Sequence, residues 1–441
     1  MKYDVVIIGG GTAGCAAAYI SAKKGLKTLI VEKNSYLGGS MTGALVLPAM
    51  KSSQNQINTK FFNKFLAELK ALGGQITYSD GNQGWFNPEL AKIALDKLLT
   101  NAGVKVIFCA NVTQIEIENS HIKSLNVSSV QNINVIDLSE PIETVLNNKK
   151  EGGAVLSEYI ETRYVIDATG NQEICQNLNC RFIDDENRKQ PYSLRFIASG
   201  VNLKEFEGFI TELDNDRNAT SSMLTENEIH LSTACTWDKD WALTPLFKEA
   251  VQKGILRDSD RAYFQLFTIP GMPNSVAFNC PRFVEEIGSN DMFKLSEGLK
   301  SARQAILRIL EFCKAYLKGF ENAYISSIAP EVGIRVSKRA LGKYVYTIDD
   351  LKSGKCFTKP VLVSNYPVDV HSEKKEGAIL EQVFREYQLP IESLMSADYE
   401  NLFFAGRGIS ADFYAQAALR IIPSCFSMGE GLANYLAEQE N

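Results

Sequence analysis

The chain has 441 residues, enough for two or three domains, and its 45% hydrophobic and 22% charged residues are typical of a globular protein. Its 46 basic and 52 acidic residues leave a formal net charge of −6, which argues against a surface that binds nucleic acid or an anionic membrane. The 9 cysteines are odd in number and form no C-x-x-C pair, so we expect free thiols in a reducing compartment and no metal site.

The longest apolar stretch, residues 5–20, does not predict a membrane span. It is shorter than the roughly 20 residues that a span needs, and consecutive glycines interrupt it. A single lysine precedes it and charged sequence follows, which is not typical of a signal peptide. We therefore expect a cytoplasmic protein without a membrane segment.

The N-terminal residues predict a strand, a helix and a second strand. Residues 3–8 and 27–31 are short β-branched runs of the kind that is buried on both faces of a parallel sheet. Between them, residues 13–22 are small and favour a helix, which Gly25 ends. This order is typical of the βαβ unit that opens many nucleotide-binding folds.

Two more helices and a group of strands follow. Between residues 57 and 69 apolar side chains recur every four positions, which predicts a helix. Asn87 and Pro88 predict the N-cap and first residue of another helix, and Gly103 predicts its end. Residues 104–168 favour strands by their alternating and β-branched pattern.

The middle of the chain has a different pattern of predicted helices and strands from its two ends. Residues 186–330 mix short strands with one long helix near 296–317, and a closing helix is predicted over 422–437. We therefore predict an α/β fold with two domains. A discontinuous Rossmann-like nucleotide-binding domain with a mostly parallel sheet comprises residues 1–185 and 331–441, and an inserted α+β substrate domain comprises residues 186–330.

A glycine-rich turn after the first strand carries the functional prediction. Gly9, Gly11 and Gly14 form G-x-G-x-x-G at the start of the first helix, and Glu32 ends the second strand. The glycines permit a tight turn, close approach of a pyrophosphate and close helix–strand packing, while the helix N-terminus offers free N–H groups. Glu32 would accept hydrogen bonds from an unphosphorylated ribose, so this context predicts a dinucleotide site.

Three segments then resemble FAD-dependent oxidoreductases with the glutathione-reductase-type FAD fold. They are the Gly38-Gly39-Ser40 turn after Glu32, the Ala168-Thr169-Gly170 segment after a strand, and residues 401–407 before the last helix. The resemblance implies FAD, with adenine near Glu32 and the flavin near the last helix. It implies these cofactor-binding residues: Gly9, Gly11, Thr12, Ala13, Gly14, Glu32, Lys33, Gly39, Ser40, Val112, Ala168, Thr169, Gly170, Gly406, Arg407 and Ile421.

Four later segments are similar to the group known simply as FAD-dependent oxidoreductases. Residues 329–339, 366–371, 406–410 and 419–425 resemble its "IAPxxGxRxSRR", "YPIDIH", "GRxIS" and "xRVMPTC" segments. The chain departs from this pattern at Lys338, at residues 389–394 and at Gln416, where related members often carry histidine. Because these departures fall on the expected substrate side, the resemblance implies no particular substrate.

Arg335, Arg339 and His371 are the candidate catalytic residues. Hydride transfer needs a base that takes a proton or a cation that holds developing negative charge, and histidine and arginine supply these. Two alternatives stay open, since the arginines could be surface charges and His371 could be a core imidazole. Cys175 and Cys180 are five residues apart and would lie on different sides of one helix, which favours two buried structural thiols over a redox pair.

The sequence thus predicts an FAD-dependent oxidoreductase that transfers a hydride between a small anionic organic substrate and the flavin. The alternatives are a flavin hydroxylase, a fumarate-reductase-like enzyme, or a non-catalytic FAD-binding subunit of a larger complex. No second G-x-G-x-x-G occurs, so a built-in NAD(P)H domain is not expected. The electron acceptor or donor and the formation of a homo-oligomer are left open.

Overall fold

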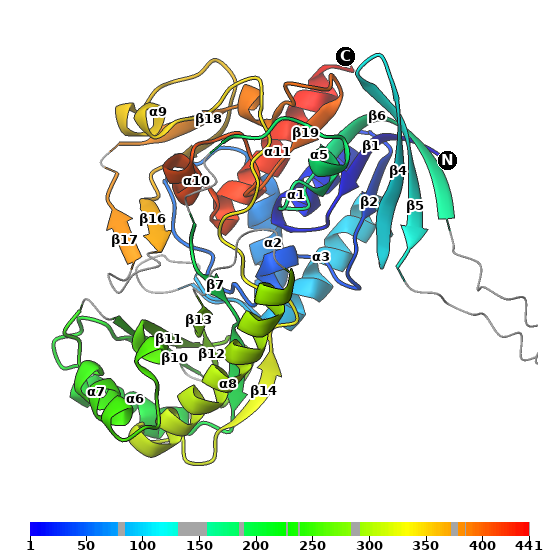
Figure 1. The fold of residues 1–441 in the computed structure, drawn as a ribbon. Coiled ribbons are helices and arrows are strands. Elements are labelled where there is room, and N and C mark those ends of the chain that lie inside the picture. Colours follow the sequence, from blue (N-terminus) through cyan, green and yellow to red (C-terminus); the bar gives the residue numbers. More distant parts are fainter. Residues whose placement is uncertain are drawn as a thin grey trace, which may run out of the picture.

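Two large sheets organise the chain, one above the other in Figure 1. The computed structural model describes residues 1–77, 84–130, 157–184, 189–225, 228–236, 239–283, 292–371, 378–383 and 385–440. A seven-stranded sheet takes strands from both ends of the chain, and a six-stranded sheet takes its strands from the middle. The predicted boundary between residues 185 and 186 lies outside the described residues, and the boundary after residue 330 stays a prediction.

The seven-stranded sheet is mainly parallel at its centre, as predicted. Its order is β3-β2-β1-β6-β5-β4, with β19 paired to β6. Strands β1, β2, β3, β6 and β19 run parallel, whereas β4 and β5 are antiparallel additions at one edge. The strands are β1 (Lys2–Ile8), β2 (Thr28–Val31), β3 (Lys105–Ile107), β4 (Ala110–Glu118), β5 (His121–Ser129), β6 (Ser157–Asp167) and β19 (Leu402–Phe404).

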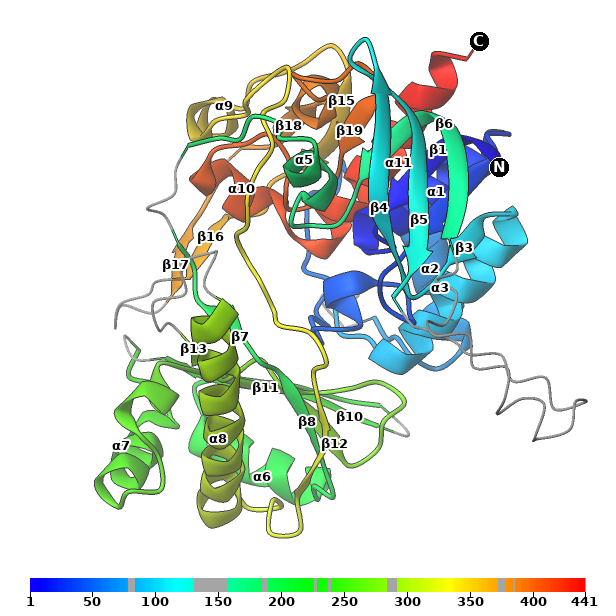
Figure 2. The same cartoon turned by 45° about the vertical axis from the view of Figure 1, so that its right-hand side comes forward.

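Helices near the parallel strands include the predicted first and last ones, α1 and α11, which pack against each other (Figures 1 and 2). Gly429 permits this approach, because a Cβ there would lie 2.1 Å from the Ala13 carbonyl oxygen. Asn87 caps α3 as predicted, its Oδ1 accepting from the Glu89 and Leu90 amides. The helices are α1 (Thr12–Lys23), α2 (Lys60–Ala71), α3 (Pro88–Ala102), α5 (Glu173–Asn177), α9 (Ile348–Ser353), α10 (Phe413–Leu419) and α11 (Ile422–Glu438).

The six-stranded sheet is antiparallel throughout, in the order β14-β8-β12-β11-β10-β9. Phe247 of α7 and Phe312 of α8 pack on Phe264 of β11, so these helices share its apolar core. The long helix predicted near 296–317 is α8. The elements are β8 (Phe196–Ser199), α6 (Leu203–Leu213), β9 (Ser221–Leu224), β10 (Ile229–Thr236), α7 (Thr244–Gln252), β11 (Tyr263–Thr268), β12 (Ser275–Phe278), α8 (Met292–Tyr316) and β14 (Tyr324–Ile328).

Short strand pairs lie between and beside the two sheets. They pair β7 with β13, β15 with β18, and β16 with β17. Their bounds are β7 (Tyr192–Ser193), β13 (Arg282–Phe283), β15 (Pro360–Ser364), β16 (Val368–His371), β17 (Ala378–Glu381) and β18 (Tyr387–Pro390). Strand β16 ends at His371, one of the candidate catalytic residues.

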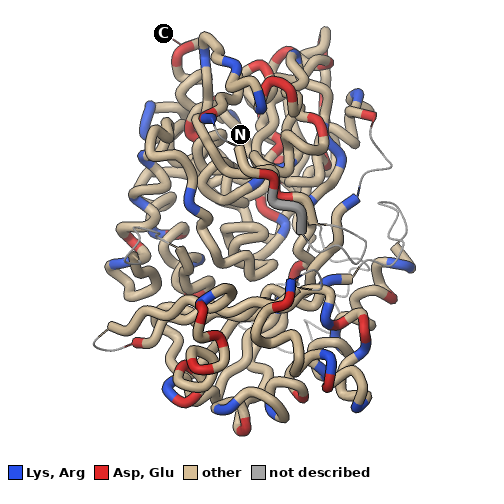
Figure 3. The backbone as a smooth tube through the Cα atoms, turned by 90° about the vertical axis from the view of Figure 1, so that its left-hand side faces the viewer, with Lys and Arg blue, Asp and Glu red and all other residues tan. Residues whose placement is uncertain are grey.

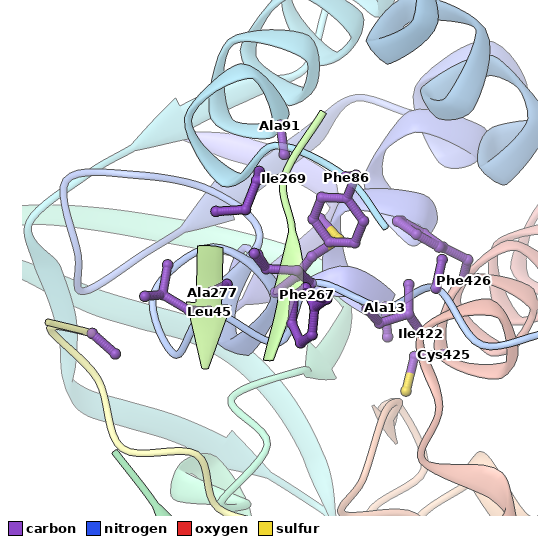
Figure 4. Packing of buried hydrophobic residues seen from close by; sticks show 14 of the residues in the cluster. Ala13, Leu45, Phe86, Ala91, Phe267, Ile269, Ala277, Ile422, Cys425 and Phe426 are labelled. Atoms are coloured by element: carbon purple, nitrogen blue, oxygen red, sulfur yellow. The ribbon is translucent and has the colours of Figure 1, made fainter. Parts of the chain in front are cut away.

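One apolar core joins the two sheets. Figure 4 shows Leu45 and Phe86, from beside the parallel sheet, next to Phe267 and Ala277 of the antiparallel sheet. Trp85 stacks on Phe267, with ring centroids 4.1 Å apart. Basic and acidic residues are interspersed along the chain (Figure 3). None of the helices in the described part of the chain is long and apolar enough to cross a membrane.

Candidate functional site

A cavity of about 710 Å³ runs from the parallel strands toward the antiparallel sheet. Its wall contains the ends of β1 and β2, the residues directly after β6, the start of α1, the loop after β19 and the start of α11. Residues of β11 and β16 complete the wall at the other end. This volume lies within the range of small-molecule and cofactor sites.

Three glycines of the Gly9–Gly14 turn, Gly9, Gly11 and Gly14, have separate steric reasons. Gly9 has a φ of +100°, and a Cβ there would lie 2.6 Å from the Ala168 carbonyl oxygen. A Cβ on Gly14 would lie 2.0 Å from the Gly9 oxygen, so Gly14 brings the helix against the strand. At Gly11 the nearest atom to a Cβ is 3.9 Å away, which leaves open cavity beside the first amides of α1. The missing side chain thus creates room for a ligand at a helix N-terminus.

The Glu32 carboxylate stands where β2 ends. Its Oε2 accepts from the Gly10 amide at 2.6 Å, and its Oε1 accepts from the Asn34 amide at 2.8 Å. Burial raises the pKa of Glu32, while these two amides oppose the shift. The carboxylate lines the cavity and keeps unused lone pairs, so it can accept hydrogen bonds from a ligand. Beside it, Lys33 and Glu173 form an ion pair of 2.9 Å.

Asp167 shapes the segment after β6. One of its oxygens accepts from the Thr169 amide and hydroxyl at 3.1 and 2.7 Å. The other accepts from the Ile174 and Cys175 amides at 2.9 and 3.1 Å. The carboxylate is fully buried, and burial raises its pKa. These bonds hold Ala168, Thr169 and Gly170 against the cavity.

Arg407 provides a half-buried cation in the middle of the wall. Its Nη2 donates to Asn171 Oδ1 at 2.7 Å and its Nη1 to Ser40 Oγ at 3.3 Å. Its buried Nε has no hydrogen-bond partner among the described residues. A free donor of this kind, together with the Gly11 opening and the Glu32 carboxylate, fits an extended dinucleotide with an anionic middle.

Asp369, His371 and Arg420 form a linked group at the far end of the cavity. His371 Nε2 lies 3.3 Å from Asp369 Oδ2, and Arg420 Nη2 lies 3.2 Å from the same oxygen. Burial alone would raise the pKa of Asp369, but its contact with His371 and the charge of Arg420 hold it well below its usual range. Burial and the charges of Arg335 and Arg282 hold the pKa of His371 well below 6.5, so this imidazole is neutral at pH 7.

Two further arginines line the same end, which we call the arginine chamber. Arg335 Nη1 donates to Pro191 O at 2.6 Å and Ser193 Oγ at 2.8 Å. Arg195 Nε donates to Asn279 Oδ1 at 2.7 Å, and burial with the charge of Arg282 lowers the pKa of Arg195 to about 10. The chamber wall consists of Arg195, Tyr263, Gln265, Asn279, Arg335, Tyr366, Asp369, His371 and Arg420.

Most residues singled out in the sequence line this cavity. His371 and Arg335 lie in the arginine chamber. Arg339, Gly14 and Val112 are not part of its wall, and Arg339 is buried elsewhere, with its carbonyl oxygen accepting from the Ile183 amide. The other predicted cofactor-binding residues in the wall are Gly9, Gly11, Thr12, Ala13, Glu32, Lys33, Gly39, Ser40, Ala168, Thr169, Gly170, Gly406, Arg407 and Ile421.

Sequence reasoning missed several chamber residues. Asp369 and Arg420 stand inside the two late segments quoted above, so those segments could have pointed to them. Arg195 and Tyr263 belong to the middle of the chain, where no motif marks them. Only the packing of the two sheets brings these side chains to the cavity.

Curated proteins similar to part of this chain include two from Methanococcus vannielii. Its thiamine thiazole synthase is 30% identical over 174 residues, which are 39% of this chain and 57% of that protein. Its digeranylgeranylglycerophospholipid reductase is 31% identical over 122 residues, which are 26% of this chain and 31% of that protein. The chain therefore matches less than two thirds of either relative's length.

Solved structures resemble the whole chain at low identity. One is a geranylgeranyl bacteriochlorophyll reductase-like protein from Thermoplasma acidophilum, with 15% identity and a TM-score of 0.43. It matches 100% of this chain and 79% of its own.

The family assignment extends over nearly the whole chain. Residues 4–440 match the family described as FAD dependent oxidoreductase. This span includes the glycine turn, the Asp167 segment, the arginine chamber and α11, which together form the cavity wall. The chain therefore belongs to the FAD-dependent oxidoreductase family, and it is an enzyme whose cofactor is FAD.

Proposed function

We propose that the enzyme transfers a hydride between a small anionic organic substrate and FAD. The arginine chamber carries this proposal, because it places buried cations beside a neutral histidine at one end of the cofactor cavity. Buried guanidinium groups favour an anionic ligand, and a neutral imidazole can take a proton. The middle and opposite end of the same cavity have the features that suit a dinucleotide.

The orientation of FAD follows from these two ends. Glu32 would accept hydrogen bonds from the adenosine ribose, and the Gly11 opening and the first amides of α1 would bind the diphosphate. The isoalloxazine ring would lie near Gly406 and the start of α11, whose N-terminus favours negative charge. Bound FAD supplies the two-electron acceptor for a hydride. This arrangement also supports the proposed glutathione-reductase-type grouping.

His371 is the proposed general base. Its Nε2 faces Asp369, and its Nδ1 is buried without a hydrogen-bond partner in the described part of the chain. A hydrogen on Nε2 would be held by Asp369, which leaves Nδ1 as the proton acceptor. Arg335 would hold the anionic group of the substrate. In the reverse direction, which is hydrogenation of an unsaturated acid, protonated His371 would return the proton.

Replacing Glu32 with alanine should weaken FAD binding by about 1–3 kcal/mol, because two backbone amides and the ribose hydroxyls lose their acceptor. Titrating the FAD-free protein with FAD and following flavin fluorescence measures this change. Glu118→Ala is the matched control, since this exposed carboxylate lies on the same sheet and is not part of the cavity wall. Equal FAD affinity for both variants would contradict the role of Glu32.

Anaerobic reduction of the FAD-loaded enzyme tests the proposed function. We expect a panel of small hydroxy, amino and saturated acids to contain at least one compound that bleaches the flavin absorbance. Neutral analogues, such as the matching amides, should leave it unchanged. Bleaching by neutral compounds alone would overturn the proposal, and NADPH-dependent oxygen consumption would support the hydroxylase alternative instead.

A further inference from the structure

Three guanidinium groups at the arginine chamber have no carboxylate partner in the described residues. Arg195 donates to an amide and a carbonyl oxygen, and Arg335 donates to a carbonyl oxygen and a hydroxyl. Arg282 lies over the ring of Tyr263, with its Cζ 3.4 Å from the ring centroid. Its Nε and Nη2 are buried without hydrogen-bond partners among the residues that the structure describes. Every one of these contacts is to a neutral group.

The carboxylate that the described chamber wall contains, that of Asp369, is already engaged. Asp369 contacts His371 and a fourth arginine, Arg420, through the same oxygen. Asp369 and Arg420 therefore balance each other in charge, and His371 is neutral. Asp369 thus supplies one negative charge among four guanidinium groups, and no described acidic side chain forms an ion pair with Arg195, Arg282 or Arg335.

Like charges held together in a buried space repel each other, and this repulsion lowers the pKa of a guanidinium group. Burial lowers the pKa of Arg335 well below its usual value, and the charges of Arg282, Arg195 and Arg420 lower it further. Burial of charge without a partner is costly, and it is offset when a ligand supplies the opposite charge with matching hydrogen bonds. One carboxylate would leave most of this positive charge in place, whereas two would nearly balance it.

The arginines also approach the chamber from separate segments. Arg195 precedes β8, Arg282 belongs to β13 and Arg335 follows β14. The three segments lie side by side, because Ser193 pairs both with Arg282 of β13 and with Gly333. Arg195 and Arg335 have separate hydrogen-bond partners, so each guanidinium group can bind one carboxylate. Arginine pairs readily with planar carboxylates through parallel hydrogen bonds.

We propose that the substrate of this enzyme is a small dicarboxylate, with its two carboxylates bound by Arg335 and Arg195 and with Arg282 compensating the remaining charge from behind Tyr263. This proposal rests on the proposed function, since it names the class of anion that occupies the chamber. It makes Arg195, which no sequence motif marks, a specificity-determining residue.

Ligand binding to the FAD-loaded enzyme tests the proposal without any turnover. The probes are oxalate, malonate, succinate and glutarate, compared with the monocarboxylates of equal chain length and with methylphosphonate at constant ionic strength. Calorimetry and perturbation of the flavin absorbance report binding. At least one dicarboxylate should bind about 100-fold more tightly than its monocarboxylate, a difference typical of one additional charge-assisted pair in a buried site.

Two variants test whether Arg195 and Arg335 cause the preference for dicarboxylates. Arg195→Gln and Arg335→Gln should each lower dicarboxylate affinity by at least about tenfold and should bring it close to that of the monocarboxylate. Arg303→Gln changes an exposed arginine on α8 that is not part of the cavity wall, so affinity should not change. The wild-type comparison stands by itself if a variant does not fold.

The outcomes separate this inference from the proposed function. Equal affinity for mono- and dicarboxylates, or tighter binding of methylphosphonate, would overturn the dicarboxylate assignment. Selective dicarboxylate binding by an enzyme whose flavin no acid reduces would overturn the hydride-transfer proposal and leave this one standing. Flavin reduction by monocarboxylates without a preference for a second carboxylate would support the hydride-transfer proposal and overturn the dicarboxylate assignment.

Discussion

Turnover of the FAD-loaded enzyme should fall by roughly 10²–10⁴-fold when His371 is replaced with alanine, the usual contribution of a general acid–base residue. FAD binding and the fold should be retained, because the imidazole lies in the arginine chamber, where its ring contacts among the described residues include Asp369 and Tyr263. Steady-state kinetics with the acid identified by anaerobic reduction measures the change. His121→Ala, on β5 and outside the cavity wall, is the control and should keep wild-type turnover.

The pH dependence of turnover is a second test of His371 as the general base. A base works in its neutral form, and the pKa of His371 lies well below 6.5. Activity should therefore stay constant from neutral pH into the acidic range and fall only when the pH drops through that lowered pKa. Removing the charge of Arg335 should raise the pKa of His371 and move this fall to higher pH.

If the loss of turnover in His371→Ala does not exceed that in His121→Ala, His371 is a structural residue.

Asp167→Ala should lower the free energy of unfolding by about 3 kcal/mol or more, since four hydrogen-bond donors lose one buried acceptor. The same change should weaken FAD binding, because the Ala168–Gly170 segment loses the carboxylate that holds it. Urea denaturation of the FAD-free protein and FAD titration measure the two effects separately. Asp240→Ala removes an exposed carboxylate and should change stability by less than about 0.5 kcal/mol.

A stable Asp167→Ala variant with unchanged FAD affinity would show that the backbone alone maintains this segment. Asp167→Asn is a useful companion variant. It preserves the shape of the side chain but turns an N–H₂ group toward backbone donors, so it should also lose stability.

The sequence predicted the elements whose signals are local. Strand β1 and helix α1 follow from apolar runs and a glycine turn, and α3 follows from Asn87 and Gly103. The helix predicted over 57–69 begins only at Lys60, because Asn58 has a φ of +54° that an α-helix does not allow. Its first turn is supported from outside, where Glu430 of α11 accepts from the Phe61 amide at 2.8 Å. Because Glu430 and Phe61 are far apart in the sequence, no local sequence pattern predicts this contact.

The candidate site was predictable only where one segment carries it. His371 and Arg335 stand in recognisable segments and line the cavity, whereas Arg339 is not part of its wall, so a catalytic role for Arg339 stays a prediction. The expectation that Cys175 and Cys180 are buried is confirmed, yet the argument from one continuous helix was wrong. Helix α5 ends at Asn177, and the Cys180 amide returns to the Cys175 carbonyl oxygen at 2.9 Å.

The shared apolar core restricts how a substrate reaches the arginine chamber. Swinging the antiparallel sheet away as a rigid body would separate Trp85 from Phe267 and expose Leu45, Phe86 and Ala277 to water, at about 25 cal/mol for each Å² of apolar surface. The Asn87 side chain, which donates to Pro270 O at 3.2 Å, would also lose this contact. Hinge opening is therefore the costly route, and substrate exchange should proceed by local rearrangement at the cavity entrance while the two sheets keep their relative position.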